Sequence, residues 1–268
     1  MTATLHLILV SAVAVAAGPS LAARSQWTAS ESSQVRLLVS GTEAGRIVGG
    51  LEMLLEPGWH TYWRNPGETG IPPTFDFAGS ENVSRVEVLY PAPERYDDGA
   101  SVSLVYHDEV VFPLAVTPAD SSRPVRLEIS ASFGVCREIC IPTQAGVELT
   151  LPPSPAGDPL SEARVAQYRP RVPSAPEPGR FDIEAVKLEG NAVLIDVRAP
   201  DSAYADLFTE PPPGWYLGQA TLLSRGGGLS RYRLPLDGKP ADAQAKGQRF
   251  RFVAVAGSAA IEKVVEIH

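Results

Sequence analysis

The chain has 268 residues, of which 44% are hydrophobic and 20% are charged, and its formal net charge is −8. This composition is typical of a globular protein long enough for two domains, and it argues against an intrinsically disordered chain. The acidic balance and the lack of any run of Lys and Arg also argue against a nucleic-acid partner.

The chain begins with a segment typical of a secretory signal peptide. Residues 1–22 contain no Lys, Arg, Asp or Glu, and the apolar stretch Leu5–Gly18 precedes the small-residue pattern that ends at Ala22. An uncleaved membrane anchor is the alternative, but the stretch is shorter than the roughly 20 residues that a span needs. We therefore predict cleavage after Ala22 and export. The mature chain is then expected to have no transmembrane span and to occupy a compartment where disulfides persist.

Short β-like segments dominate residues 23–152. They mix alternating apolar and polar residues with β-branched side chains, and clusters of Gly, Pro, Asn and Asp separate them. The segments are Gln34–Gly41, Gly45–Glu56, Val83–Pro91, Glu109–Pro118, Val125–Gly134 and Gly146–Pro152. This pattern, without long helical periodicity, predicts an antiparallel β-sandwich.

The stretch Pro57–Phe77 concentrates aromatic side chains. On a strand, successive side chains point to opposite faces. One face would hold Trp59, Thr61 and Trp63, and the other would hold His60, Tyr62 and Arg64. Two interpretations stay open: a core strand whose tryptophans anchor the sandwich, and an aromatic surface that docks a partner.

The segment Tyr90–Glu109 is predicted to be a polar connection. It holds Tyr96, Asp97 and Asp98 before it reaches Tyr106. Its alternative role is a lid over an active site, in which case it would fold over the cysteines that follow in the chain.

The only two cysteines, Cys136 and Cys140, are separated by three residues. This is neither the spacing of a thioredoxin motif nor that of a zinc knuckle. Ile139, Ile141 and Pro142 favour extended structure or a turn, and such a path brings two cysteines within disulfide distance. Closing so short a loop restricts the unfolded chain by roughly 2 kcal/mol, against about 3 kcal/mol for a loop of 15 residues. The spacing is therefore as compatible with a redox pair as with a structural disulfide.

A metal site is the third possibility for the cysteines. His60 and His107 would join the two thiols in binding copper(I). For a redox pair, Arg137 is a candidate for stabilising a thiolate, although the neighbouring Glu138 partly cancels its charge. The residues by themselves leave structural disulfide, redox pair and metal site open. No Ser/His/Asp arrangement or phosphate-binding glycine loop supports a hydrolase or a nucleotide enzyme.

Residues 153–179 are predicted to be a semi-rigid linker, since eight of the 25 prolines fall between Pro152 and Gly179. A short helix is predicted inside it, with Asp158 as N-cap and Pro159 at the first helical position. Strand-like segments return in residues 180–268 and predict a second β-domain. They are Phe181–Gly190, Asn191–Pro200, Gln219–Gly226, Gln248–Gly257 and Ile261–Ile267.

Four blocks together, GWHTYWRNPGETGIPPTFDF from Gly58, YPAPERYDDG from Tyr90, VFPLAVTP from Val111 and FGVCREICIP from Phe133, resemble a known family. It is the N-terminal periplasmic domain of the DsbD-type thiol:disulfide interchange proteins, in the branch that includes the copper-tolerance protein ScsB. The resemblance covers roughly Ser33–Pro152. It implies an all-β fold of two immunoglobulin-like antiparallel sandwiches joined by the Pro-rich linker, with the likeness weaker from Phe181 onward.

The resemblance implies that Cys136 and Cys140 are the catalytic redox pair of a periplasmic electron-transfer protein. Its expected partners are thioredoxin-like periplasmic proteins and a separate membrane electron donor, and no organic cofactor is expected. The chain would then act as a component of a thiol:disulfide oxidoreductase of the protein-disulfide reductase type. Better-known members separate their cysteines by five residues, whereas here three intervene.

The resemblance also implies a cap loop around Tyr96–Gly99 that shields the pair. The candidate cap or docking residues are Tyr96, Asp97, Asp98, Tyr106, Trp59 and Trp63. The alternative function is a non-catalytic binding or copper(I)-handling module with a structural disulfide.

Overall fold

A computed structural model describes residues 23–200 and 205–268 of the chain. The predicted signal peptide, residues 1–22, lies outside the described residues. The described part is almost entirely β, with antiparallel strands, which confirms the predicted all-β, immunoglobulin-like class. Within that part, no helix is long and apolar enough to cross a membrane.

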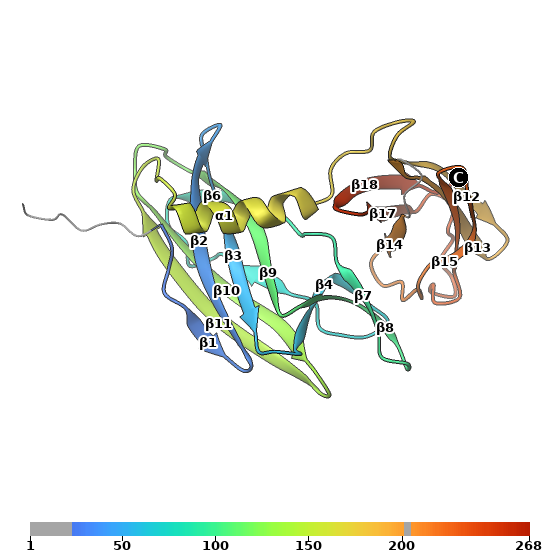
Figure 1. Cartoon of the computed structure of the whole chain (residues 1–268), viewed down its shortest axis with the longest axis horizontal. Coiled ribbons are helices and arrows are strands. Elements are labelled where there is room, and N and C mark those ends of the chain that lie inside the picture. Colours follow the sequence, from blue (N-terminus) through green and yellow to red (C-terminus); the bar gives the residue numbers. More distant parts are fainter. Residues whose placement is uncertain (1–22, 201–204) are drawn as a thin grey trace, which may run out of the picture.

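Two antiparallel sheets in residues 28–151 form the first sandwich (Figure 1). The first sheet contains, in spatial order, β1 (Thr28–Ser30), β2 (Ser33–Glu43), β3 (Arg46–Leu55), β9 (Glu109–Pro118) and β6 (Val83–Val88). The second contains β11 (Cys140–Leu151), β10 (Val125–Cys136), β4 (His60–Gly67), β8 (Val102–His107) and β7 (Glu94–Asp97), and β5 (Thr74–Asp76) pairs with β10.

The first sandwich is closed by large apolar side chains that alternate along the strands of both sheets. Trp63, Phe112 and Phe133 are each at most 1% exposed and belong to one core cluster. Burying a large apolar side chain contributes about 1.5–3 kcal/mol relative to leaving it exposed. This core holds the two sheets together and fixes the strands that carry the cysteines.

The hairpin of β7 and β8 corrects one expectation. Residues 90–109 were predicted to be a polar connection, but most of the segment is paired strand. Leu104 and Val105 are fully buried, and the Asp98 carboxylate accepts hydrogen bonds from the backbone N–H groups of Ala100 and Ser101 in the turn. A short apolar run and an Asx-type turn together make a hairpin here.

The one α-helix of the described residues, α1 (Pro159–Tyr168), covers one face of the first sandwich, and the 3-10 turn η1 (Arg169–Arg171) follows it. The Asp158 carboxylate caps its N-terminus by accepting hydrogen bonds from the N–H groups of Leu160 and Ser161. Val165 and Tyr168 join the core cluster of the first sandwich. This part of the predicted linker therefore packs against the first sandwich.

A buried carboxylate also ties α1 to the sheet. Glu52 of β3 is 2% exposed, and its two oxygens accept hydrogen bonds from Arg36 Nε and Arg164 Nε, each at 2.6 Å. Charged groups are rarely buried so completely unless they are paired in this way. The triad links α1 to β2 and β3.

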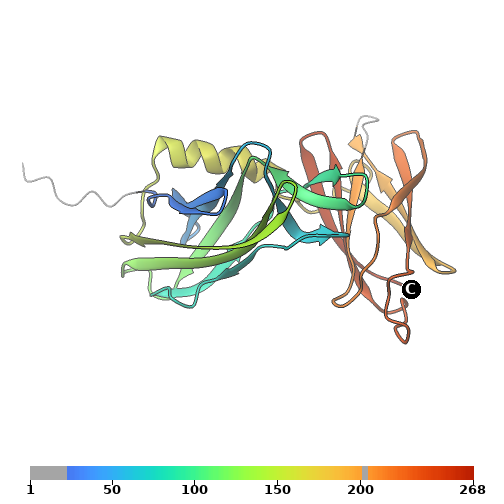
Figure 2. The ribbon, with the colours of Figure 1, turned by 90° about the horizontal axis from the view of Figure 1, so that it is seen from below.

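The second sandwich, residues 181–267, again consists of two antiparallel sheets around their own core (Figure 2). One sheet contains β12 (Asp182–Glu189), β13 (Ala192–Arg198), β16 (Leu229–Pro235) and β15 (Thr221–Gly226). The other contains β14 (Asp206–Glu210), β17 (Arg249–Ala256) and β18 (Ala259–Glu266). Trp215, Phe250 and Phe252 lie in this core.

The two sandwiches touch along the edge of the first that carries β4, β7 and β8 (Figures 1 and 2). Phe208 of β14 and Val253 of β17 belong to the core cluster of the first sandwich, and the ring centroids of Trp63 and Phe208 are 6.2 Å apart. These apolar side chains therefore join the two sandwiches across their interface.

Candidate functional site

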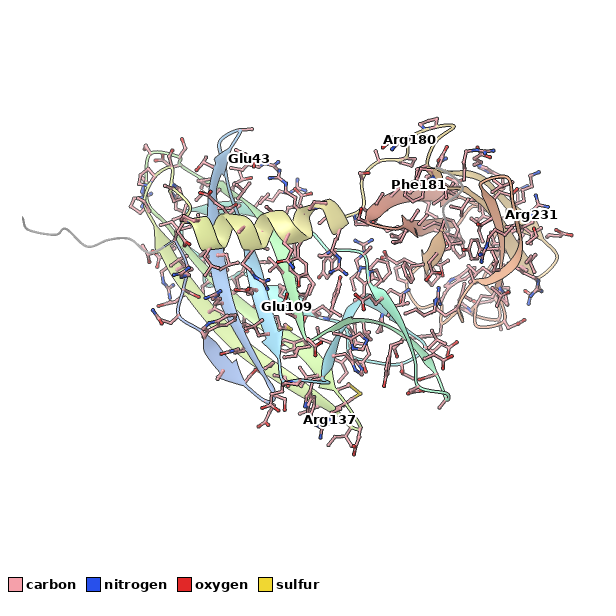
Figure 3. The ribbon with its side chains drawn as sticks, viewed as in Figure 1. Glu43, Glu109, Arg137, Arg180, Phe181 and Arg231 are labelled. Carbon is pink, nitrogen blue, oxygen red and sulfur yellow. A yellow bond between two sulfur atoms is a disulfide. The ribbon has the colours of Figure 1, made fainter. Side chains whose placement is uncertain are left out.

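The two cysteines end the two strands of one long hairpin. β10 and β11 pair without interruption from Val125 opposite Leu151 to Cys136 opposite Cys140. A disulfide joins Cys136 and Cys140, whose Cα atoms are 4.2 Å apart. Figure 3 labels Arg137 in the turn at the tip of this hairpin. The extended–turn–extended path predicted from Ile139, Ile141 and Pro142 is confirmed.

The two sulfur-bearing residues differ in exposure. Cys136 is 2% exposed, whereas Cys140 and the turn residues before it are exposed. Ile139 is 68% exposed, although it is a large apolar side chain. Thus one half of the disulfide is buried under neighbouring side chains, and the other half faces solvent.

Beside Cys136, a row of side chains crosses three strands of the second sheet. Cys136 of β10 lies opposite His60 of β4, and His60 lies opposite His107 of β8. Directly opposed residues of antiparallel strands project on the same face. The centroids of the two histidine rings are 5.7 Å apart. Both imidazoles therefore lie on the face of the sheet that carries the disulfide.

Tyr62, two residues after His60 on β4, contacts both sulfur atoms. Its hydroxyl donates a hydrogen bond to Cys136 Sγ at 2.9 Å and lies 3.1 Å from Cys140 Sγ. Tyr62 is 2% exposed and forms a small apolar cluster with Val105 and Cys136. This cluster is separate from the sandwich core, and the hydroxyl group of the phenol contacts the two sulfur atoms.

Two glycines leave room for the Tyr62 ring. A Cβ added at Gly70, where φ is +119°, would overlap one edge of the ring. A Cβ added at Gly134 would lie 3.3 Å from Tyr62 Cε2 and 2.8 Å from Ile71 Cβ. Glycine is the residue that permits both the positive φ and the close approach. The absence of side chains at these two positions therefore defines where the phenol sits.

Burial beside the disulfide keeps the side chains of His60 and Tyr62 uncharged. Burial lowers the pKa of His60 from 6.5 to about 4, and the nearby His107 acts in the same direction, while Asp98 opposes them. Burial raises the pKa of Tyr62, and Asp98 and Tyr96 raise it further. At neutral pH His60 is a neutral imidazole and Tyr62 a protonated phenol that donates its hydrogen bond.

Tyr96 of β7 packs over this group from the edge of the sheet. Its ring centroid lies 4.8 Å from that of His60 and 5.4 Å from that of His107, and the side chain packs against the cluster that contains Cys136. Asp97 is the last residue of β7 and Asp98 begins the exposed turn that follows, and each carboxylate accepts hydrogen bonds from backbone N–H groups of that turn. The structure thus brings Tyr96 next to the cysteines, while the two aspartates shape the turn.

Three of the predicted cap or docking residues are buried in the core of the first sandwich. Tyr106 is 3% exposed, donates a hydrogen bond to the Pro91 carbonyl at 2.6 Å and belongs to the sandwich core. Trp59 and Trp63 belong to the same core. These three project on the opposite face of the sheet from the disulfide, because alternate residues of a strand point to opposite sides. All three are core residues, as one of the two interpretations of the tryptophans predicted, and a docking role for them stays a prediction.

Arg137, predicted to tune a thiolate, stacks on an aromatic ring. Its guanidinium carbon lies 5.6 Å from the ring centroid of Trp59, and its backbone N–H closes the turn by bonding to the Ile139 carbonyl. Such cation–π contacts contribute about 0.5–1 kcal/mol at exposed sites. Thiolate tuning by Arg137 stays a prediction.

The histidines do not complete a metal site in this state. Among residues 23–200 and 205–268, no group of three or more His, Cys, Asp or Glu side chains is placed to hold a metal ion. The two sulfur atoms are bonded to each other, and a thiolate is the form of cysteine that binds metals. His60 and His107 lie beside the disulfide in the oxidised protein, and copper(I) binding by them stays a prediction.

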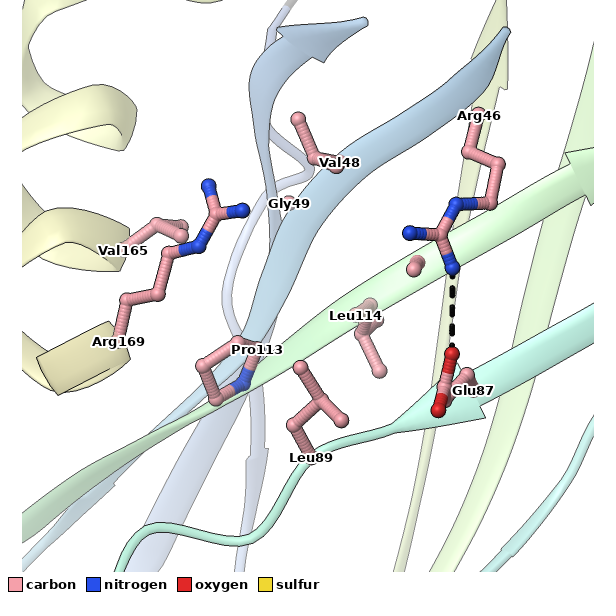
Figure 4. A pocket seen from close by; sticks show the side chains of 10 residues that line it. Arg46, Val48, Gly49, Glu87, Leu89, Pro113, Leu114, Val165 and Arg169 are labelled. Carbon is pink, nitrogen blue, oxygen red and sulfur yellow. Dashed lines mark hydrogen bonds and ion pairs between the residues drawn. The ribbon is translucent and has the colours of Figure 1, made fainter. Parts of the chain in front are cut away.

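A surface cavity of about 240 Å³ lies between α1 and the first sheet (Figure 4). Its two cations are already paired, Arg46 with Glu87 and Arg169 with Glu43. Its remaining walls are mostly apolar or glycine, and none of the residues around the disulfide lines it. Its lining therefore offers no unpaired charge and no nucleophilic side chain.

Tyr62, Gly70 and Gly134 are the functional residues that sequence reasoning did not assign. Alternation along β4 already predicted that His60 and Tyr62 share a face. The sequence could not predict that this face adjoins the cysteines, because that depends on the register of β4 against β10, whose paired residues lie more than 70 positions apart.

Comparison with known proteins agrees with this geometry. Residues 31–152 match the sequence model of the family described as "Thiol:disulfide interchange protein DsbD, N-terminal". The whole fold is similar to the crystal structure of the N-terminal periplasmic domain of ScsB from Proteus mirabilis. Their TM-score is 0.75 at 23% sequence identity, over 92% of this chain and 98% of that one. Among curated protein sequences, none matches the chain.

Proposed function

We propose that this protein is a periplasmic thiol:disulfide exchange protein, because residues 31–152 match the sequence model of the DsbD N-terminal family. In this proposal, Cys136 and Cys140 cycle between disulfide and dithiol and carry two electrons. The partners are thioredoxin-like periplasmic proteins and a separate membrane electron donor. The single observation that carries the proposal is the unequal exposure of the two sulfur-bearing residues next to a phenol that contacts both sulfurs.

The exposure supports a division of roles between the cysteines. Cys140 is exposed at the hairpin tip, so its sulfur is the one that a partner's sulfur reaches. Cys136 is buried beside Tyr62, whose hydroxyl is placed to donate a hydrogen bond to a thiolate at that sulfur. Donation to the charged form lowers a thiol pKa. Cys140 is then the exchanging residue and Cys136 the resolving one.

In the reducing direction, the Cys140 thiolate attacks one sulfur of a partner disulfide. The other partner sulfur leaves as a thiolate and takes up a proton from solvent. The Cys136 thiolate then attacks Cys140 Sγ, which breaks the mixed disulfide and closes the Cys136–Cys140 bond. The partner departs with two thiols, and the protein has lost two electrons.

The reverse sequence reloads the protein. A thiolate of a reduced donor attacks Cys140 Sγ, and Cys136 leaves as a thiolate next to the Tyr62 hydroxyl. The second donor thiol then releases Cys140, and the donor ends as a disulfide. A thiol with a low pKa leaves faster. The expected contribution of Tyr62 is therefore to speed the first step by lowering the pKa of Cys136.

Trapping tests the proposal. A Cys136→Ser variant keeps the exposed Cys140 but lacks the resolving thiol, so it should accumulate mixed disulfides with thioredoxin-like proteins in a periplasmic extract. The matched variant Cys140→Ser keeps only the buried Cys136 and should accumulate far less. Non-reducing gels and mass spectrometry identify the adducts. Absence of such adducts from both variants would overturn the exchange proposal.

A second measurement separates a redox pair from a structural disulfide. The purified protein is equilibrated in glutathione buffers, and the thiol state is read by mass-shift labelling. A redox pair titrates within the range of those buffers. A pair that stays oxidised below about −300 mV is a structural disulfide, and the proposal then fails.

A further inference from the structure

Two consecutive residues of β7 connect the disulfide to the second sandwich. Tyr96 packs over His60 and His107 on the face of the sheet that carries the cysteines. Arg95 projects to the other side of the strand, as alternation requires, and reaches β14 of the second sandwich. The strand that covers the disulfide is thus held on its opposite side by the other domain.

The Arg95 guanidinium bonds to the second sandwich through all three of its nitrogens. Nε and Nη2 bond to the two carboxylate oxygens of Asp206 at 3.3 and 2.9 Å, and Nη2 also bonds to the Leu207 carbonyl at 3.2 Å. Nη1 donates to Gln219 Oε1 at 3.0 Å, and the guanidinium carbon lies 5.3 Å from the ring centroid of Phe208. A two-pronged arginine–carboxylate pair fixes orientation as well as distance.

Apart from these contacts, β7 has few anchors. It is a four-residue strand at the edge of its sheet and pairs only with β8. Glu94 adds an ion pair with Arg171 at 3.3 Å, between two exposed groups. Exposed ion pairs contribute little. The bonds of Arg95 are therefore the main tether of this strand outside its own hairpin.

A second arginine joins the two sandwiches without involving the hairpin. Arg64 of β4 pairs with Glu210 of β14 and with Glu262 of β18. Glu210 and Asp206 are thus two acidic residues of one strand, each facing a different arginine of the first sandwich. One pair holds β7, and the other holds β4.

From this arrangement we propose that Arg95 is a positioning residue through which the second sandwich holds Tyr96 against His60 and the buried Cys136 side of the disulfide. The proposal rests on the proposed function, for which it supplies the control of access. Because Cys140 itself faces solvent, β7 limits only the approach over Tyr96: a partner sulfur that comes from that side has to displace β7. That displacement breaks the bonds from Arg95 to Asp206 or moves the second sandwich with the strand. The second sandwich then helps to control access to the disulfide through its bonds to Arg95.

The rate at which dithiothreitol reduces the Cys136–Cys140 bond in the full chain tests this proposal. The variant Arg95→Met removes every hydrogen bond of the guanidinium but keeps an apolar stem beside Phe208, and Asp206→Ala removes its main acceptor. Both should raise the second-order rate constant about three- to tenfold, because charge-assisted bonds are lost only from the covered state. The double variant should be no faster than the faster single variant, since both changes break one link.

Glu210→Ala is the matched control, because it cuts the Arg64 pair on the same strand and leaves Arg95 intact. Its rate constant should stay within about twofold of the original protein. Equal acceleration by Glu210→Ala would mean that loosening of the interface in general exposes the disulfide, and it would overturn the role of Arg95. Unchanged rates in both Arg95→Met and Asp206→Ala would overturn it as well.

An NMR titration of His60 gives a readout that a purely structural role of Arg95 would not move. His60 faces Tyr62, Tyr96 and His107, with Asp98 nearby. Moving Tyr96 away hydrates the imidazole, so its pKa should rise from about 4 towards 6.5 in Arg95→Met and stay unchanged in Glu210→Ala. An unchanged His60 pKa in Arg95→Met, in a protein with its original unfolding midpoint, contradicts the proposal.

These measurements need no protein partner. If the trapping variants capture no thioredoxin-like protein while the rate effects hold, the exchange function fails and the tether stands. If partners are captured and the rates do not change, the tether fails alone.

Discussion

The hydroxyl group of Tyr62 lies 2.9 Å from Cys136 Sγ and 3.1 Å from Cys140 Sγ, so one phenol serves both sulfur atoms of the disulfide. A hydrogen bond of this kind is stronger when the acceptor is charged. A thiolate at Cys136 in the reduced state would therefore gain more from Tyr62 than the disulfide does. This difference makes the phenol a determinant of the reduction potential.

Replacing Tyr62 with Phe should make the reduction potential more negative by about 20–40 mV. The loss corresponds to about 1–2 kcal/mol of stabilisation of the reduced state, and 30 mV corresponds to about 1.4 kcal/mol for two electrons. Equilibration with glutathione measures the shift. Tyr168→Phe is the matched control, since that hydroxyl bonds to Glu109 and not to the sulfurs. An unchanged potential in Tyr62→Phe would show that the phenol only fills space.

Gly70→Ala should displace the Tyr62 ring and thereby reproduce the redox effect of Tyr62→Phe. The new methyl group would overlap the ring, and the backbone there has φ of +119°. Gly41→Ala is the control, because its φ is +134° and nothing lies within 4 Å of the added Cβ. Both variants should lose about 1–3 kcal/mol of unfolding free energy from backbone strain. Only Gly70→Ala should shift the potential, and an equal shift in Gly41→Ala counts against the packing argument.

The stability of the oxidised protein should fall as the pH drops from 6.5 to 4. Burial holds the pKa of His60 at about 4 in the folded protein, against 6.5 when exposed. Between these values the unfolded chain binds a proton that the folded chain does not, so acidification favours unfolding. The contribution of His60 is about 1–2 kcal/mol, because part of the shift is offset by solvent near the site.

Urea unfolding at pH 7, 6, 5 and 4 checks this dependence by comparison with His60→Gln. Glutamine does not titrate, so the variant should lose less stability over the interval. Paired carboxylates such as Glu109, whose pKa is lowered by Arg164, contribute equally to both proteins and cancel in the difference. Parallel pH curves for the two proteins would refute the assignment.

Removing the Glu52 carboxylate by Glu52→Gln should cost about 3 kcal/mol of unfolding free energy. The substitution leaves Arg36 and Arg164 without their shared buried partner. Glu87→Gln is the control, since its pair with Arg46 is exposed and should contribute less than about 1 kcal/mol. Urea unfolding measures both. A loss of similar size in the two variants would show that burial adds nothing to the Glu52 triad.

Much of the fold could be predicted from the sequence because it rests on local signals. Alternation and turn residues predicted the long strands, for example those that became β9 and β10, to within a few residues. The hairpin of β7 and β8 was not predicted, since β7 is a short, polar strand and its turn is rich in aspartate. Propensity carries little information for an edge strand that is stabilised by its neighbour and by Arg95.

The candidate site was only half predictable for a related reason. Neighbouring residues in the sequence predicted the turn between the cysteines. They also predicted that His60 and Tyr62 lie on the same face of a strand. The contacts that define the chemistry, Tyr62 with Cys136 and Arg95 with Asp206, join residues 74 and 111 positions apart in the chain. Such contacts depend on strand register and domain docking, which no local pattern encodes.

The two glycines that flank Tyr62 have a consequence for sequence divergence. The ring of Tyr62 occupies the space that side chains at positions 70 and 134 would need. The aromatic residue and the two glycines therefore depend on one another. A side chain added at position 70 or 134 displaces the ring unless the residue at position 62 becomes smaller. Homologous domains should therefore inherit an aromatic residue together with both glycines, or have lost all three, and correlated substitution at these positions would trace the lineages that kept the phenol on the sulfurs.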